Sequence, residues 1–253
     1  MAIAIRKPSE INNLALSGKI VAQAINYAKS LIREGVSLLE IDQAVEEFIF
    51  SCDARPAFKG LYGFPNSACI SVNSVVIHGI PTSYKLQKGD IVGIDVGVEK
   101  NGWYGDAAIT VGVGQLSSED ESLISCAYQT LIDIIGEIKV GMHFKEVSFL
   151  LGESIKAYGF VPLRDYCGHG IGRRPHEEPQ IPNYLSGGSA RSGEKIKEGM
   201  VFCLEPMVCQ KSGDPVILAD GWSVVSKDGL NTSHYEHTVA IIGGRAEILS
   251  KEE

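Results

Sequence analysis

The segment Gly89–Val113 constrains this chain more than any other stretch, because it predicts a β-hairpin that carries two acidic residues. Two runs rich in β-branched residues flank an Asn101-Gly102 pair, which is typical of a tight hairpin turn. A four-residue loop would pair Asp95 with Asp106, whereas a two-residue loop would pair Asp95 with Ala108. In either register the two carboxylates lie on the same face of the hairpin.

Two like charges on neighbouring strands destabilise a sheet unless a positive group lies between them. Asp95 also stands inside an apolar run, where a carboxylate without a partner is costly. A divalent cation between Asp95 and Asp106 would remove both penalties. The hairpin therefore predicts a cation site.

The second half of the chain repeats the plan of the first. Lys195–Val208 matches Lys85–Val98 at an offset of 110 residues, and this alignment places Glu205 on Asp95. A final predicted strand, 235–242, supplies a further acid, Glu236. Chance alignment of short apolar runs is the alternative, but the match of acid with acid favours a duplication.

Amphipathic spacing predicts paired helices in each half. Ser9 and Ser37 are expected to cap two helices in the first half, and Ser118 is expected to cap the first helix of the equivalent pair in the second. Helices followed by antiparallel strands, twice over, predict an α+β fold in which helices cover one face of a curved antiparallel β-sheet. We expect a single catalytic domain over 1–253, with pseudo-twofold halves at about 9–113 and 118–248 and a shared site on the other face of the sheet.

Composition narrows the possible partners and the compartment. A net charge of −8 and a pI near 5.3 argue against nucleic acid or an anionic membrane as partner. The sequence has no apolar run of membrane-spanning length and no secretion signal at its start, which predicts a cytoplasmic protein. The six cysteines form no C-x-x-C pair, so reduced and mostly buried thiols are expected rather than a zinc or redox motif.

Histidines add nitrogen donors to these acids. His169 stands between glycines in Gly168–Gly172, a loop suited to close approach of a ligand, and His176 follows seven residues later. Each acid alone could be a strand-end cap, His169 a loop or core histidine, and His176 part of a surface turn. Together they form a mixed oxygen and nitrogen set that suits Mn, Co, Fe or Zn better than Ca. Two such ions held close together are the usual arrangement for hydrolysis.

The order and spacing of these residues carry a resemblance to a known family. Asp95, Asp106, His169, Glu205 and Glu236, within GHGIGRRPHEEP, FCLEPMV and YEHTVAI, resemble the short, bacterial-style (type I) methionine aminopeptidases over nearly the whole chain. The resemblance implies the pita-bread (creatinase/aminopeptidase) fold. It also implies that these five residues bind two divalent metal ions (Mn, Co, Fe or Zn) and remove the initiator methionine from nascent proteins whose second residue is small.

The resemblance also implies roles for individual residues. Glu205 would transfer a proton, His176 would stabilise the tetrahedral oxyanion, and His78 would contact the substrate backbone. The pocket for the methionine side chain would be lined by Phe58, Leu61, Phe64, Cys69 and Trp222. For Cys69, an ordinary position in the apolar core is as good an interpretation as a place in the pocket wall. The implied partner is the N-terminal methionine of nascent polypeptides, with transient ribosome contact and a monomeric protein as further expectations.

The chain departs from the usual type I pattern at five positions beside the expected site: Leu61, Tyr104, Pro175, Cys203 and His234. None of these is an expected metal ligand, so activity is expected while pocket shape and rate are open. A Xaa-Pro aminopeptidase or prolidase is the nearest alternative, although those enzymes carry a large N-terminal domain for which the residues before Ser9 leave no room. A non-catalytic binding protein of the same fold is the second alternative, and the presence of all five ligands argues against it.

Overall fold

The structure, a computed structural model, describes residues 2–251. The helices are α1 (Pro8–Leu31), α2 (Leu38–Ser51), α3 (Ser118–Glu137) and α4 (Phe144–Ala157), together with the short 3-10 helix η1 (Leu61–Gly63). The strands are β1 (Arg55–Pro56), β2 (Cys69–Val72), β3 (Val75–Ile77), β4 (Ile91–Lys100), β5 (Trp103–Gly112), β6 (Val161–Pro162), β7 (Cys167–Gly170), β8 (Glu177–Pro182), β9 (Val201–Leu204), β10 (Met207–Cys209), β11 (Pro215–Ile217), β12 (Val224–Ser226), β13 (Thr232–His234), β14 (Glu236–Ile242) and β15 (Arg245–Ile248).

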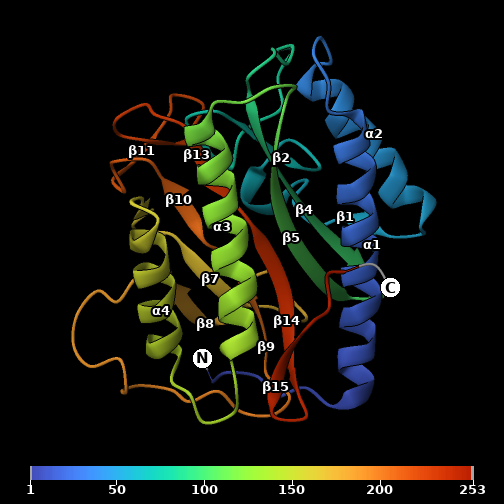
Figure 1. Cartoon of the computed structure of the whole chain (residues 1–253). Helices are drawn as coiled ribbons and strands as arrows, with labels where there is room; N and C mark the ends of the chain where they lie inside the picture. Colours follow the sequence, from blue (N-terminus) through green and yellow to red (C-terminus); the bar gives the residue numbers. More distant parts are fainter. Residues whose placement is uncertain (1, 252–253) are drawn as a thin grey trace.

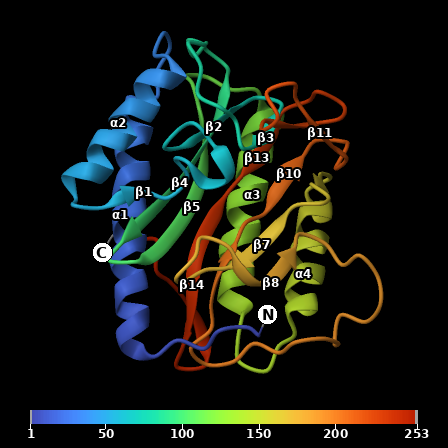
Figure 2. The same cartoon turned by 180° about the vertical axis from the view of Figure 1, so that it is seen from behind.

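A curved antiparallel sheet forms the centre of the molecule. Its strands run in the order β1-β4-β5-β14-β9-β7-β8, with β2 added to β4 and β15 added to β14. The long helices lie in front of this sheet in Figure 1, and in Figure 2, turned by 180°, the strands lie in front of them. The predicted α+β pita-bread architecture, with α-helices α1 to α4 covering one face of a curved antiparallel sheet, is therefore confirmed.

The hairpin of β4 and β5 adopts the two-residue loop. Lys100 pairs with Trp103, and both turn residues have positive φ, 56° at Asn101 and 75° at Gly102. Asparagine and glycine tolerate that conformation, which matches the twist of the flanking strands. Asp95 consequently lies opposite Ala108, and the four-residue alternative is wrong.

Two helix starts differ from the sequence predictions by one or two residues. Helix α1 begins at Pro8 with Lys7 as its N-cap, rather than with Ser9, because proline favours the first helical position. Helix α3 is capped by Ser117, whose side chain accepts from the backbone N–H of Asp120. The capping box predicted at Ser37 is confirmed.

The two pairs of helices pack on the sheet in a similar way. Residues of α1 and α2 bury their apolar faces against β2 and β4, whereas α3 and α4 bury theirs against β9 and β14. The two sets meet where β5 pairs with β14. This arrangement agrees with the predicted pseudo-twofold plan, although the boundaries 9–113 and 118–248 stay a prediction. Among residues 2–251, no helix is both long and apolar enough to cross a lipid bilayer.

Candidate active site

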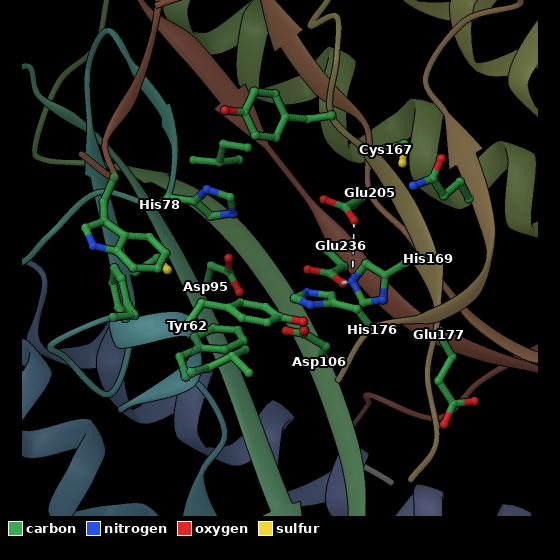
Figure 3. A pocket seen from close by; sticks show the side chains of 18 of the residues that line it. Tyr62, His78, Asp95, Asp106, Cys167, His169, His176, Glu177, Glu205 and Glu236 are labelled. Atoms are coloured by element: carbon green, nitrogen blue, oxygen red, sulfur yellow. Dashed lines mark ion pairs between the residues drawn. The ribbon is translucent and has the colours of Figure 1, made fainter. Parts of the chain in front are cut away.

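One cavity of about 480 Å³ gathers the residues singled out in the sequence. It opens on the face of the sheet that the helices leave uncovered, and Figure 3 shows its side chains converging on one space. The predicted residues that line it are Phe58, Leu61, Phe64, Cys69, His78, Asp95, Asp106, His169, His176, Glu205, Trp222 and Glu236.

Strand register brings the four acids together. Asp95 of β4 and Glu236 of β14 each lie directly opposite Ala108 of β5, so the three residues form a row across neighbouring strands. Asp106 is two residues from Ala108 and shares its face. Glu205 follows the last residue of β9, the strand on the other side of β14. The methyl group of Ala108 is small, which leaves room between the carboxylates.

His169 presents a nitrogen lone pair to this group. Its Nδ1 lies 3.1 Å from the carbonyl oxygen of Gly170, and because a carbonyl can only accept, Nδ1 is the protonated nitrogen. Its Nε2 lies 3.6 Å from Glu205 Oε1 and 3.9 Å from Glu236 Oε1 (Figure 3). A lone pair facing two carboxylate oxygens is unfavourable without a cation between them.

The electrostatics of the acids indicate the same deficit of positive charge. Burial and mutual repulsion raise the pKa of Asp106, Glu205 and Glu236 well above the ordinary range, and burial raises the pKa of Asp95 to about 6. Burial lowers the pKa of His169 to about 3. The atoms Asp95 Oδ1, Asp106 Oδ1 and Glu236 Oε1 are buried and have no hydrogen-bond partner among the described residues. The donor set therefore fits divalent cations.

Two groups of donor atoms lie close enough to hold an ion. One consists of Asp106, His169, Cys203 and Glu236, the other of Glu205, His234 and Glu236, and within each group all atoms lie within 4.8 Å of one another. Cys203 and His234 entered the sequence analysis only as departures beside the site, so their place among the donors is new. Cys203 lies in the apolar strand β9 and His234 ends the short polar strand β13, and no spacing rule singled them out.

Two further histidines lie at the sides of the cavity. His78 has a positive φ of 56°, and its ring meets Tyr166 edge to face at a centroid distance of 5.7 Å. His176 meets His169 edge to face at 4.5 Å and lies parallel to Tyr62 at 6.2 Å. Partial burial lowers the pKa of His176, and burial lowers that of His78 to about 4, so both rings are neutral near pH 7.

The residues predicted to bind the methionine side chain form one apolar cluster beside the acids. Phe58, Phe64 and Cys69 are buried together, and Leu61 and Trp222 pack against them. The rings of Phe64 and Trp222 meet at 5.2 Å, nearly perpendicular. Cys69 both belongs to this apolar cluster and lines the cavity.

Sequence reasoning missed other residues of the cavity wall. Tyr62, Tyr166, Cys167 and Gln180 line it. Tyr62 follows Leu61 in the sequence, and Tyr166 and Cys167 precede the glycine-flanked His169. Their closeness in sequence to predicted site residues was the one indication that they line the cavity. Tyr104 is not among the residues that line the cavity, and it packs against the cluster that holds Trp103 and Cys203.

Fold and site together define a metallopeptidase, since a cation-binding group of buried carboxylates adjoins an apolar pocket on the open face of the sheet. Residues 12–242 match metallopeptidase family M24. The methionine aminopeptidase of Helicobacter pylori strain J99 is 61% identical over 252 residues, covering 99% of this chain and 100% of the relative.

Solved structures give the same result. The crystal structure of a methionine aminopeptidase from Thermotoga maritima has a TM-score of 0.96 at 39% identity and covers 99% of this chain and 100% of its own. A prolidase from Pyrococcus furiosus has a TM-score of 0.80 at 26% identity, and the match covers 98% of this chain but 66% of the prolidase. The chain therefore belongs to the methionine aminopeptidases of family M24.

Proposed function

We propose that this protein removes the initiator methionine from nascent polypeptides whose second residue is small. The observation that carries this function is the direct contact of two features in one cavity. Four buried carboxylates and His169 form a cation site, and the apolar cluster around Phe58 adjoins it. A peptide whose first side chain fills the apolar pocket has its first peptide bond beside the carboxylates.

Use of divalent metal agrees with membership of family M24, and we propose that two ions bind. Asp95 and Glu236 would hold one ion, His169 and Glu205 the other, with Asp106 and Glu236 bridging them. Ions bound in this way lower the pKa of a water molecule and polarise a carbonyl group, which provides a nucleophile near neutral pH. Oxygen and nitrogen donors suit Mn, Co, Fe and Zn, and supply in the cell decides among them.

Three residues of the chain perform the remaining chemistry in this proposal. Glu205 accepts the proton of the attacking water and delivers it to the leaving amine, because its carboxylate lies at the cavity with a raised pKa. His176, neutral and at the side of the cavity, donates a hydrogen bond to the developing oxyanion. His78 contacts the backbone of the bound peptide from the opposite half of the chain.

The apolar cluster is suited to an unbranched thioether side chain. Phe58, Phe64 and Trp222 surround the space with aromatic rings, and sulfur makes favourable contacts with ring edges. Leu61 and Cys69 complete the wall without adding a charge. A methionine side chain would therefore be held without the loss of a hydrogen bond.

The test of this function compares substrates on metal-stripped protein. Chelator-treated protein is supplied with Mn, Fe, Co or Zn singly, and release of the first residue is measured from Met-Ala-Ser and from an Ala-Pro peptide. Metal-dependent release of methionine is expected. If neither peptide loses its first residue with any metal, the protein is a non-catalytic binding protein of this fold. Preference for the Ala-Pro peptide would favour a prolidase-type activity, because the prolidase from Pyrococcus furiosus shares the fold.

Three further expectations complete the proposal. Nascent chains are made in the cytoplasm, so we place the protein there. Transient contact with the ribosome would bring the enzyme to its substrate as the chain emerges. We also expect a monomer.

A further inference from the structure

A second imidazole flanks Glu205 on the side away from His169. His169 Nε2 lies 3.6 Å from Glu205 Oε1, and His234 Nε2 lies 3.6 Å from Glu205 Oε2. The carboxylate thus has one ring nitrogen at each oxygen. These two histidines come from strands β7 and β13, which are far apart in the sequence.

The two imidazoles differ in what they offer. His169 lines the cavity, whereas His234 is 3% exposed and is not among the residues that line it. His234 therefore reaches Glu205 from behind. Its Nε2 is buried and has no hydrogen-bond partner among residues 2–251, and a buried polar atom in that state costs free energy until it is paired.

The surroundings of His234 fix which nitrogen carries the proton. Its Nε2 faces Glu205, and a donor atom of Glu236 lies within 4.8 Å of this pair. Burial lowers the pKa of His234, and the nearby charge of Asp95 only partly opposes that shift, so the ring is neutral. His78 is the other titratable neighbour. An ionised Glu205 carboxylate, the form that binds a metal ion, only accepts, so the proton of His234 belongs on Nε2, the reverse of the assignment at His169.

The backbone holds this ring in place. The N–H of His234 donates to Thr110 Oγ1 at 2.9 Å, and the Thr110 hydroxyl donates to the His234 carbonyl at 2.8 Å. Strand β13 also pairs with β10, where His234 lies opposite Met207. Because the backbone of His234 is held at both its N–H and its carbonyl, the ring approaches Glu205 from a fixed position, from which it can orient the carboxylate.

We propose that His234 is a positioning residue that donates its Nε2–H to the outer oxygen of Glu205, so that the inner oxygen stays directed at the cavity beside His169. The present separation exceeds a hydrogen bond by about 0.5 Å, which a small rotation of the Glu205 side chain removes. This inference rests on the proposed function only in giving Glu205 its role as a ligand and proton carrier. The approach of His234 Nε2 to Glu205 Oε2 is present in the structure without metal or substrate.

The test uses two replacements of His234 and one control. His234→Gln places an amide N–H near the position of Nε2, and His234→Leu removes the donor at similar size. His143→Gln is the matched control, because His143 is a half-buried residue at the N-cap of α4 that does not line the cavity, and its side chain bonds the Gly193 carbonyl. Each protein is stripped of metal, titrated with cobalt by calorimetry and by visible absorption, and assayed with Met-Ala-Ser.

The expected result distinguishes two roles of His234, a hydrogen-bond donor to Glu205 and a metal ligand. Loss of an outer partner of a metal ligand typically costs about 10–100-fold in affinity or activity, so His234→Leu should weaken cobalt binding or kcat by that factor, with little change in KM. His234→Gln should stay within about threefold of the unchanged protein, since the amide still donates. If His234→Leu binds cobalt and turns over substrate like the unchanged protein, the proposal is overturned. If His234→Gln loses as much cobalt affinity or kcat as His234→Leu, His234 is a metal ligand instead.

Two further measurements keep the proposal testable in every case. If His234→Leu does not fold, His234→Asn, which keeps an amide but stops short of Glu205, is expected to show the same losses. If the unchanged protein binds no cobalt, the proposed function is wrong, and the contact is then judged by ¹H–¹⁵N NMR of the metal-free protein. A protonated, slowly exchanging Nε2 on His234 is expected there, and a protonated Nδ1 would overturn the proposal.

Discussion

The ring of Tyr62 lies parallel to that of His176, with 6.2 Å between centroids and 9° between planes. His176 in turn meets His169 edge to face, so three rings lead from the surface to the group of acids (Figure 3). Tyr62 is 77% exposed and has a φ of 51°, an uncommon conformation for a residue with a side chain. A large aromatic side chain held in this way at the edge of the cavity packs against one face of the His176 ring.

We expect Tyr62→Ala to lower kcat about two- to tenfold, because an aromatic pair contributes about 0.5–1.5 kcal/mol to the position of its partner. Tyr62→Phe keeps the ring and should restore most of the rate. Tyr27→Ala is the control, since Tyr27 is also exposed and stacked, on Phe48 of α2. Steady-state kinetics with Met-Ala-Ser provides the measurement, and equal rates for all four proteins would show that the stack does not orient His176.

Replacement of Asp106 by asparagine tests the bridging position. The carboxylate is buried with Oδ1 unpaired. Burial, and then the charges of Glu236, Asp95 and Glu205, raise its pKa well above the ordinary range. Asp106→Asn keeps the shape but removes the charge, so we expect activity to be abolished while the circular dichroism spectrum is retained. Asp133→Asn, on the exposed face of α3, should leave both unchanged. Full activity of Asp106→Asn would exclude Asp106 as a bridging ligand.

The acids also predict an unusual pH dependence for the metal-free protein. The folded-state pKa values of Asp106, Glu205 and Glu236 lie well above their unfolded values near 4, so the folded protein binds more protons and loses stability as pH rises. The histidines act in the opposite direction. The pKa values of His78 and His169 fall to about 4 and about 3, so their contribution to stability increases with pH but is complete above about 6.5.

Of these acids and histidines, the acids are the groups that still titrate above about pH 6.5, and the melting temperature of chelated protein should therefore fall from pH 6.5 to pH 8. Saturating metal should remove this decline, because it stabilises the ionised carboxylates. Metal at about 100 times its dissociation constant adds about 2.7 kcal/mol, which corresponds to roughly 5–10 °C in a chain of this length. Scanning calorimetry with chelator or with manganese measures both effects. A chelated protein whose melting temperature is constant or rises over this range would contradict the prediction.

The sequence predicted the donors of the site better than their surroundings. Asp95 and Asp106 could be assigned to one face because β alternation holds in either hairpin register, but only the positive φ of Asn101 and Gly102 decided between the registers. His234 was visible as a departure, yet its contact with Glu205 depends on the pairing of β13 with β10. Such contacts between distant strands leave no local periodic signal, which also explains why the stacking of Tyr62 on His176 was missed.

A pair of glycines sets the distance between α1 and the strand that carries Asp106. A Cβ atom added to Gly105 of β5 would lie 2.7 Å from the backbone nitrogen of Gly18, so the helix would have to move. We expect Gly105→Ala to cost about 1–3 kcal/mol of unfolding free energy, as overpacking usually does.

The matched control is Gly136→Ala in α3, where an added Cβ meets nothing within 4 Å. That replacement should instead stabilise the protein by about 0.5–1 kcal/mol, because alanine favours the helix. Urea unfolding of the metal-free variants measures both values without interference from ion binding. Because Gly105 directly precedes Asp106, Gly105→Ala should also reduce cobalt affinity, whereas Gly136→Ala should not. Destabilisation of equal size in both variants would mean that general helix effects, rather than the close approach of α1 to β5, determine the result.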